Sequence, residues 1–262
     1  MLKMVADIGN TRQKFHFFDA KELIGTELYD GMADGSCLLK WFSRYGIPDM
    51  AVVSAVVNRE LLFMPTLLAH CRVLRFGHHT PLPIVNGYAT PHTLGFDRLA
   101  AAVGGASLFP GEPVLVIEAG TCIKYELVVD GVYQGGIIAP GIQMKAKALH
   151  TFTAKLPLVV PEPDVEVPLT GNTTEQALLS GIVNVAVAAM HSIIETYRKE
   201  HPTLRIVIGG GDMNYFDKRL KYSIFAAPNI VAQGLNEILD FNENNTEIWF
   251  SAGSDDRTDT AP

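Results

Sequence analysis

The sequence is poor in cysteine and in basic residues. Its 262 residues include three cysteines, with no CxxC pair, and 21 Lys and Arg against 28 Asp and Glu, a formal net charge of −7. An odd number of cysteines without metal spacing favours a reducing compartment and predicts neither a disulfide framework nor a zinc site. The acidic balance argues against sequence-independent binding to nucleic acid or to an anionic membrane, which requires a basic face, although a local site can still bind a small anion.

Long apolar runs are also missing. The longest one, from Gly181 to Met190, is interrupted by Asn184 and has about half the length that a membrane-spanning helix needs. The apolar N-terminal run ends at Asp7, too early for a signal peptide. We therefore expect a cytoplasmic protein with no membrane partner.

The common nucleotide and hydrolase motifs are absent from the sequence. It contains no GxxxxGK[ST] loop, no GxGxxG fingerprint, no HExxH and no GxSxG. These absences argue against P-loop kinases, simple dehydrogenases, zinc proteases and serine hydrolases.

What the sequence does have is the composition and patterning of an α/β protein. A hydrophobic content of 48% suits a globular chain, and the length favours two modest domains. The patterning predicts strands over residues 2–8, 13–19, 51–57, 114–117, 124–129 and 204–208, and helices from residue 96, over 174–197 and over 231–239. Asp130-Gly131 predicts a hairpin turn, and the polar residues after 242 predict a loose tail.

Two short blocks of the sequence echo one another. Residues 7–11 (Asp-Ile-Gly-Asn-Thr) are followed by Lys14, and residues 118–121 (Glu-Ala-Gly-Thr) are followed by Lys124. Each block has an apolar strand, a carboxylate, a glycine and a hydroxyl residue, and then a second strand. The echo favours a duplicated architecture of two domains.

Such a block can bind phosphate. A glycine at the bend lets backbone N–H groups approach a phosphate, the hydroxyl adds a donor, and the carboxylate can hold hydrated Mg²⁺. Two blocks facing one another across a cleft would grip the phosphates of a nucleotide, and the triple glycine at 209–211 would let a nucleoside lie against bare backbone. The alternative is that the blocks are plain hairpins and the triple glycine is a structural turn.

Asp97 and Arg98 stand at the predicted start of a helix. Asp97 is either a simple N-terminal helix carboxylate or a base for a substrate hydroxyl, with Arg98 as a clamp for a substrate carboxylate.

These features together resemble a known family, the type III pantothenate kinases of the acetate-kinase, sugar-kinase and actin superfamily. The resemblance covers residues 5 to about 240 and keeps the family's order of motifs. The motifs that carry it are residues 7–11, 95–98 (Gly-Phe-Asp-Arg), 118–121, 135–141 (Gly-Gly-Ile-Ile-Ala-Pro-Gly), 153–157 (Thr-Ala-Lys-Leu-Pro), 171–174 (Gly-Asn-Thr-Thr) with Ser180-Gly181, 209–212 (Gly-Gly-Gly-Asp), and 227–229 (Ala-Pro-Asn) with Gly234-Leu235.

The resemblance implies an α/β fold of two ribonuclease-H-like domains with mixed sheets flanked by helices, as in actin and sugar kinases, with the active-site cleft between them. We place the N-terminal domain at residues 1–113, the C-terminal domain at 114–242 and a polar tail at 243–262. It also implies a homodimer with the substrate site near the interface. The implied reaction is ATP-dependent phosphorylation of the terminal hydroxyl of pantothenate to 4′-phosphopantothenate, the first step towards coenzyme A.

The resemblance also assigns roles to single residues. Asp97 would be the general base and Asp7 would hold Mg²⁺. Pantothenate would be held by Tyr88, Gly95 and Arg98, with Thr174 reaching over from the partner subunit. The residues implied for ATP are Asn10, Thr11, Lys14, Gly120 and Thr121 at the phosphates, and Gly209, Gly210 and Gly211 at the nucleoside.

The second block departs from the family pattern. The family usually has Asp where this chain has Glu118, and Thr where it has Lys124. Members also use a monovalent cation, K⁺ or NH₄⁺, and Glu118 would stand at that cation. If the β pairing is regular, Lys124 pairs with Glu118 and its ammonium takes the place of the cation; alternatively Lys124 faces solvent. The departure also leaves open a non-catalytic accessory or regulatory protein, or another small-molecule kinase of the superfamily.

Overall fold

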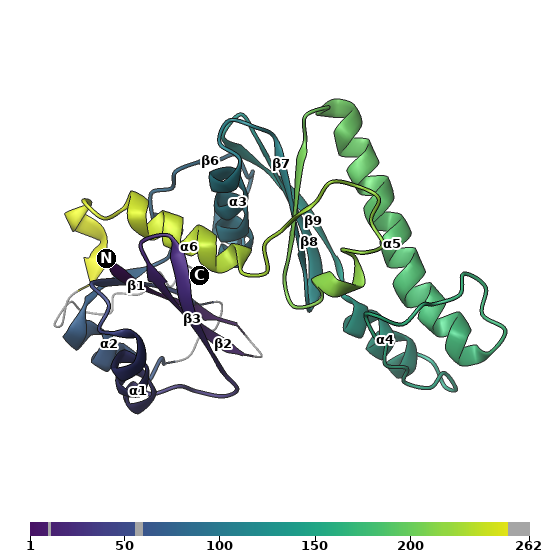
Figure 1. The fold of residues 1–262 in the computed structure, drawn as a ribbon, viewed down its shortest axis with the longest axis horizontal. Helices are drawn as coiled ribbons and strands as arrows, with labels where there is room; N and C mark the ends of the chain where they lie inside the picture. The colour runs from purple at the N-terminus through teal and green to yellow at the C-terminus, as the bar shows by residue number, and fades with distance from the viewer. Residues whose placement is uncertain (10–11, 56–59, 251–262) are drawn as a thin grey trace. The chain divides into compact units, whose positions relative to one another are not determined.

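A computed structural model describes residues 1–9, 12–55 and 60–250 of the chain (Figure 1). The contacts divide the chain into two compact units. Unit 1 contains residues 1–83, 90–103 and the chain from Val231 onward, and unit 2 contains residues 84–89 and 104–230.

Unit 1 is built on a six-stranded mixed sheet in the order β12-β5-β4-β1-β2-β3. β1, β2 and β3 form an antiparallel meander, β4 and β5 run parallel to β1, and β12 pairs antiparallel with β5. The strands are β1 (Leu2–Ile8), β2 (Gln13–Asp19), β3 (Glu22–Tyr29), β4 (Met50–Ala55), β5 (Arg72–Arg75) and β12 (Trp249–Phe250). The pairing of β12 makes Trp249-Phe250 an anchor for the chain that follows α6.

Helices cover both faces of this sheet. Helix α1 (Gly35–Tyr45) begins after Asp34, whose side chain caps it by accepting from two backbone N–H groups. With α2 (Met64–His70) it buries aromatic side chains against the sheet; the rings of Phe15 and Trp41, for example, lie 4.7 Å apart. On the other face the wholly buried Lys3 pairs with Asp240 of α6 (Ile230–Phe241) at 2.5 Å. Short 3₁₀ helices occupy Pro91–Thr93 and Thr246–Ile248.

Unit 2 repeats five strands of this sheet, but its sixth strand lies at the opposite edge. Its order is β11-β10-β7-β8-β9-β6, with an antiparallel meander of β7, β8 and β9 followed by β10 and β11 parallel to β7. At the hairpin turn that the sequence predicted, Asp130 and Gly131 both have positive φ, 51° and 72°. The strands are β6 (Val85–Asn86), β7 (Val114–Ala119), β8 (Cys122–Val129), β9 (Val132–Pro140), β10 (Arg205–Gly209) and β11 (Phe225–Ala226).

Helix α5 (Thr174–Glu200) packs its buried side chains on one face of this sheet together with α4 (Ile142–Thr151). Helix α3 (Phe96–Leu108) begins in unit 1 and ends in unit 2, where Gly105 lies against Val116 of β7. A 3₁₀ helix over Met213–Tyr215 follows β10. By length and composition α5 could cross a membrane, but the side chains on its buried face belong to the core of unit 2.

The duplication inferred from the two sequence blocks is confirmed. The meander β1-β2-β3 with β4 and β5 parallel to β1 matches the meander β7-β8-β9 with β10 and β11 parallel to β7, and only the sixth strands, β12 and β6, are placed differently. Two mixed sheets flanked by helices are the fold that the sequence predicted. Because unit 1 takes in α6 and unit 2 takes in residues 84–89, each unit contains more than one stretch of chain. The domain limits at residues 113 and 242, and the cleft between the domains, stay predictions.

Candidate active site

The first sequence block forms the hairpin between β1 and β2 (hairpin 1). Asp7 is the second-last residue of β1 and lies directly opposite Lys14 of β2. The turn is closed by the Gly9 N–H, which donates to the Arg12 carbonyl at 3.1 Å. The predicted phosphate-binding residues Asn10 and Thr11 lie outside the described residues. A carboxylate and an ammonium group therefore flank this turn, as expected from the sequence.

The second block forms the corresponding hairpin between β7 and β8 (hairpin 2). Glu118 is the second-last residue of β7 and lies directly opposite Lys124, with which it forms an ion pair. The two side chains are only 17% and 14% exposed, so water screens the pair poorly. The Gly120 N–H donates to the Cys122 carbonyl at 3.0 Å, and open space lies where a Cβ of Gly120 would be. The first of the two alternatives for Lys124, pairing with Glu118, is the one in the structure.

The triple-glycine turn lies directly against this hairpin. The Asp212 N–H donates to the Ala119 carbonyl at 3.0 Å. Gly210 has φ +88°, and a Cβ there would overlap the backbone of Ala119, so only glycine fits. At Gly211 nothing lies within 4 Å of an added Cβ. The turn is therefore fixed against hairpin 2 at Gly210, while the backbone at Gly211 has open space beside it. A nucleoside could lie against such exposed backbone.

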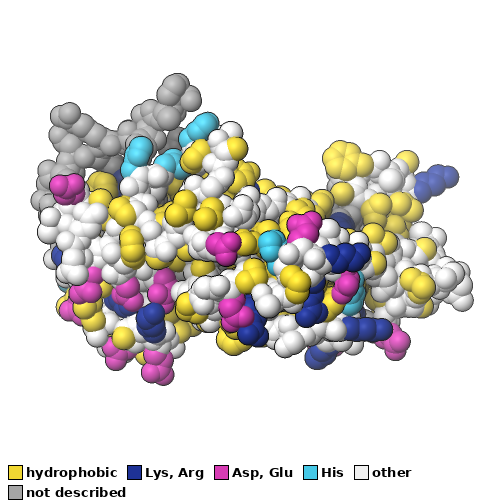
Figure 2. All heavy atoms as spheres, turned by 90° about the horizontal axis from the view of Figure 1, so that it is seen from above, with side chains coloured by type: hydrophobic (Ala, Val, Ile, Leu, Met, Phe, Trp, Pro, Cys, Tyr) yellow, Lys and Arg dark blue, Asp and Glu magenta, His cyan; other side chains and the backbone are white. Residues whose placement is uncertain are grey.

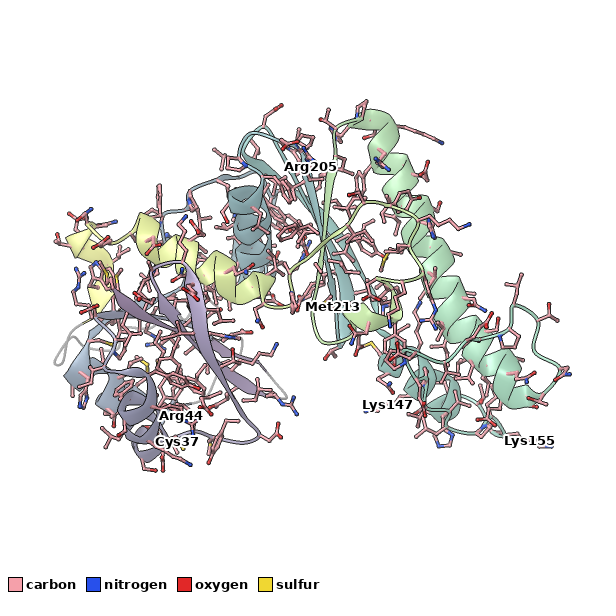
Figure 3. All side chains as sticks on the ribbon, viewed as in Figure 1. Cys37, Arg44, Lys147, Lys155, Arg205 and Met213 are labelled. Atoms are coloured by element: carbon pink, nitrogen blue, oxygen red, sulfur yellow. The ribbon has the colours of Figure 1, made fainter. Side chains whose placement is uncertain are left out.

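The segment at the start of α4, to which the sequence motifs assigned no role, completes this arrangement. The Gly141 N–H donates to the Thr121 carbonyl at 3.1 Å, and a Cβ on Gly141 would overlap the carbonyls of Gly120 and Thr121. Close approach of two backbones is a reason for glycine that no local pattern of strands or helices reveals. Hairpin 2, the triple-glycine turn and the start of α4 therefore meet at one end of the unit 2 sheet (Figure 3, where Met213 marks the end of the turn).

This end of the sheet is partly shielded from water. Burial raises the pKa of Asp212 above its ordinary value. At the other end of β10, Arg205 pairs with Glu112 at 2.6 Å on the exposed surface.

Asp97 stands in the first turn of α3, as predicted. Its Oδ1 accepts from the Arg98 backbone N–H at 2.9 Å, and the Arg98 side chain is buried. A Cβ on Gly95 would lie 2.7 Å from the same Oδ1. The Asp97 carboxylate is therefore held against the first turn of α3, and glycine at position 95 makes room for it.

The predicted substrate residue Tyr88 belongs to unit 2. Its backbone N–H donates to the Asn86 side chain at 3.1 Å, and its ring stacks on Tyr133 with centroids 6.0 Å apart. Tyr133 was not among the predicted site residues. Thr174 is the exposed first residue of α5, after its N-cap Thr173.

The carboxylates determine which metals this chain can hold. Among the described residues no three His, Cys, Asp or Glu side chains are grouped as a ligand set. Asp7, at the end of β1 beside the glycine turn, fits a hydrated Mg²⁺, which takes one or two protein carboxylates and fills its other positions with water and phosphate oxygens. Glu118 is already engaged by Lys124.

Comparison with known proteins identifies the family. The family model for type III pantothenate kinases matches residues 3–196. A type III pantothenate kinase from Phocaeicola vulgatus is 38% identical over 244 residues, 92% of this chain and 99% of its own length, and one from Christiangramia forsetii is 38% identical over 246 residues. This chain belongs to the type III pantothenate kinase family.

Solved structures agree on the fold of this family member. A protein described as a Baf family transcriptional activator from Campylobacter jejuni has a TM-score of 0.58 at 18% identity and covers 92% of this chain and 99% of its own. A glucokinase from an Antarctic psychrotroph has a TM-score of 0.51 at 14% identity, with coverage of 92% and 99%. At these identities the likeness shows the actin and sugar-kinase fold alone.

Proposed function

We propose that this type III pantothenate kinase transfers the γ-phosphoryl group of ATP to the terminal hydroxyl of pantothenate, which gives 4′-phosphopantothenate, the first step of coenzyme A synthesis. The observation that carries the proposal is the position of Asp97, held in the first turn of α3 beside the buried Arg98.

Asp97 acts as the base in this proposal. The pantothenate hydroxyl gives its proton to the Asp97 carboxylate while its oxygen bonds to the γ-phosphorus, and the bond from that phosphorus to the bridging oxygen of ADP breaks. Because its Oδ1 accepts from the Arg98 N–H, the carboxylate has a fixed orientation when substrate arrives. A positioned base of this type contributes about 10²- to 10⁴-fold to the rate. The remaining catalysis is positioning and charge neutralisation.

The glycine-rich end of unit 2 supports the nucleotide site. Gly120 and Thr121 offer the backbone and hydroxyl of hairpin 2 to the phosphates, and the turn at 209–211 offers open backbone to the nucleoside. Lys14, with Asn10 and Thr11, supplies the corresponding groups in unit 1. Asp7 holds Mg²⁺, which neutralises charge on the phosphates when it is bound.

Pantothenate carries a carboxylate at the end remote from its terminal hydroxyl. The Arg98 guanidinium has the donor geometry to bind that carboxylate. Gly95 and Tyr88 supply the remaining contacts in this proposal.

A coupled assay that follows ADP release with ATP, Mg²⁺ and pantothenate tests the function. We expect turnover that depends on pantothenate and falls about 10²- to 10⁴-fold in Asp97→Asn, because the amide cannot take the proton. Pantothenate binding without turnover by the wild-type protein would instead support a non-catalytic accessory protein. Turnover with other small alcohols and not with pantothenate would indicate another kinase of the superfamily.

We also propose that the Lys124 ammonium stands where other members hold a monovalent cation, so that K⁺ or NH₄⁺ is not required. Lys124 already neutralises Glu118 in a poorly hydrated place. A lysine ammonium and K⁺ carry the same charge, so the position next to the nucleotide keeps its electrostatic balance. The other alternative, a solvent-facing Lys124, does not describe a side chain that is 14% exposed.

A second copy of the chain is the partner we propose. Only 39% of the most apolar 18-residue window of α5 is buried within the protomer, and Val185 on this helix is 58% exposed. Phe152 and Leu169, both in the loop between α4 and α5, are 85% and 83% exposed. An apolar surface of this kind is typical of an interface.

The dimer and its catalytic role can be tested together. We expect Val185→Glu to shift the protein from dimer to monomer in light scattering, with the exposed Lys147→Glu on α4 as the control (Figure 3). If Thr174 acts across the interface, the Thr174→Ala and Asp97→Asn homodimers should each be inactive. Exchange of subunits between them gives mixed dimers, which should regain activity. One site of each mixed dimer then has both side chains intact. A monomeric wild-type protein, or α5 bound to lipid vesicles, would contradict the proposal.

The surface supports the other expectations about partners. The chain is acidic, and on the face that Figure 2 shows, Lys and Arg side chains lie next to Asp and Glu side chains. This pattern supports the proposal of a cytoplasmic enzyme that does not bind nucleic acid.

A further inference from the structure

Unit 2 contains a buried carboxylate to which neither the sequence nor the proposed reaction gives a task. Glu126 of β8 and Tyr133 of β9 both have no exposed surface. The Tyr133 hydroxyl donates to Glu126 Oε2 at 2.5 Å. A hydrogen bond to a charged acceptor is short and roughly twice as strong as a neutral one. Burying a carboxylate is costly, so its retention in a sheet calls for a reason.

A β-bulge creates this pair. Glu126 lies opposite Gly136 and Leu127 opposite Gly135, but Val128 lies opposite Tyr133, so Gln134 is an extra residue in β9. In a regular strand Tyr133 and Gly136, three residues apart, would face opposite sides of the sheet. The extra residue turns Tyr133 to the side of Glu126. Bulges that redirect a side chain in this way are frequent beside active sites.

Glycines on β9 make room for the Glu126 carboxylate and for the Tyr88 ring. A Cβ on Gly136 would overlap the Tyr125 carbonyl and would also lie 2.7 Å from Glu126 Oε2, so glycine there leaves space for the β8 backbone and for the carboxylate. Gly135 has φ +104°, and its missing Cβ would lie 3.3 Å from the Tyr88 ring. The bulge therefore accommodates the Glu126 carboxylate at one residue and the Tyr88 ring at the next.

Tyr88 is fixed to the same assembly by backbone and by ring. The Gly87 N–H donates to the Tyr133 carbonyl at 3.0 Å, and a Cβ on Gly87 would lie 2.8 Å from that oxygen. The Tyr88 ring stacks on the Tyr133 ring at an interplanar angle of 24°. The orientation of Tyr133 therefore determines the orientation of Tyr88.

We propose that the Glu126–Tyr133 hydrogen bond is a positioning device for substrate: it locks the Tyr133 ring, which holds the Tyr88 ring in the orientation that binds pantothenate. The inference rests on the proposed function, in which Tyr88 contacts pantothenate. Glu126 and Tyr133 are positioning residues, since neither has surface that a substrate could touch.

The experiment compares pantothenate kinetics in three variants. Tyr133→Phe removes only the hydroxyl and should raise KM for pantothenate about tenfold, which corresponds to about 1.4 kcal/mol. Its kcat and its KM for ATP should stay within about twofold of wild type. Glu126→Gln keeps a neutral acceptor for the hydroxyl and should raise the same KM by about threefold, because the neutral bond is weaker. The control is Tyr125→Phe, the neighbouring buried tyrosine of β8 on the other face of the sheet, with no expected change in KM.

The outcomes separate positioning from a merely structural role. If Tyr133→Phe lowers the melting temperature and the active fraction while KM for pantothenate stays as in Tyr125→Phe, the pair is structural and the proposal is wrong. If Tyr133→Phe does not fold, an unchanged pantothenate KM in Glu126→Gln overturns the proposal in the same way.

Tyr88→Ala distinguishes the positioning role from the proposed function on which it rests. No change in pantothenate KM in Tyr88→Ala would show that Tyr88 does not bind the substrate, and the proposed function would lose that residue. A raised KM in Tyr88→Ala with none in Tyr133→Phe would overturn the positioning role alone.

Discussion

Glu118 and Lys124 lie directly opposite one another on β7 and β8 and form an ion pair in a place that is mostly shielded from water. Asp7 and Lys14 hold the same two positions on β1 and β2. The two hairpins therefore carry a carboxylate and an ammonium group at matching places in the two units. In hairpin 2 the acid is one methylene longer than in hairpin 1.

The pair predicts how the enzyme responds to K⁺. We expect wild-type activity to be the same, within about twofold, in K⁺-free buffer and in K⁺, because the Lys124 ammonium already balances Glu118. Lys124→Thr removes that charge and should be slow without K⁺ and recover when K⁺ or NH₄⁺ is added. The measurement is kcat against cation concentration, with Na⁺ salts keeping the ionic strength constant. The control is Lys147→Thr, an exposed lysine of α4. Strong activation of the wild type by K⁺ would remove the proposal.

Gly95 predicts a second effect, on the base. In Gly95→Ala the new Cβ would lie 2.7 Å from Asp97 Oδ1, so the carboxylate must shift. We expect kcat to fall at least about tenfold while KM for ATP is little changed, because the mutation displaces the proposed base and leaves the nucleotide site intact. Since both changes act on the same group, Gly95→Ala combined with Asp97→Asn should be no slower than Asp97→Asn alone. If kcat of the double variant falls below that of Asp97→Asn by the same factor that Gly95→Ala causes alone, Gly95 acts on a group other than Asp97.

His16 predicts how stability depends on pH. Burial, with a smaller effect from Lys14, lowers the pKa of His16 from 6.5 to about 4. The unfolded chain therefore binds a proton between these values that the folded chain does not, so His16 destabilises the fold as pH falls from 6.5 to about 4. The full effect is about 3 kcal/mol.

The check is urea unfolding of wild type and His16→Gln at pH 7.5 and pH 4.5. Carboxylates elsewhere titrate equally in both proteins, so the difference isolates His16. We expect His16→Gln to lose about 2–3 kcal/mol less than wild type on acidification. If wild type and His16→Gln lose the same free energy of unfolding on acidification, His16 is protonated inside the fold.

The sequence predicted the elements whose signals are local. The bounds of β1 and β2 follow from apolar strands on either side of a glycine turn, and α5 follows from a long apolar pattern. No element was assigned to residues 22–45, where β3 is an edge strand with half-exposed alternation and α1 is short and amphipathic. Edge strands lack the continuous apolar run by which buried strands are found.

The residues of the candidate site also fall into those with a local sequence pattern and those without one. Asp97 and the glycine turns were found because a helix start and a strand end have local patterns. The role of Gly141 depends on its approach to Gly120, twenty-one residues earlier in the sequence, and the direction of Tyr133 depends on a bulge in the register of β9. Register is a property of paired strands, so a single strand's pattern does not reveal it.

Two adjacent glycines of unit 2 predict opposite outcomes from the same substitution. Gly210 has φ +88° and no room for a Cβ, whereas Gly211 has neither constraint. Gly210→Ala should therefore lower the melting temperature, since the left-handed conformation alone costs about 1–2 kcal/mol for an alanine and the overlap with Ala119 adds to it. Gly211→Ala should leave the melting temperature unchanged. If the nucleoside lies against this turn, the Gly211→Ala methyl group occupies its place, and KM for ATP should rise severalfold while KM for pantothenate stays constant. A Gly211→Ala enzyme with wild-type KM for ATP would show that the nucleoside binds elsewhere, even if Gly210→Ala is as unstable as expected.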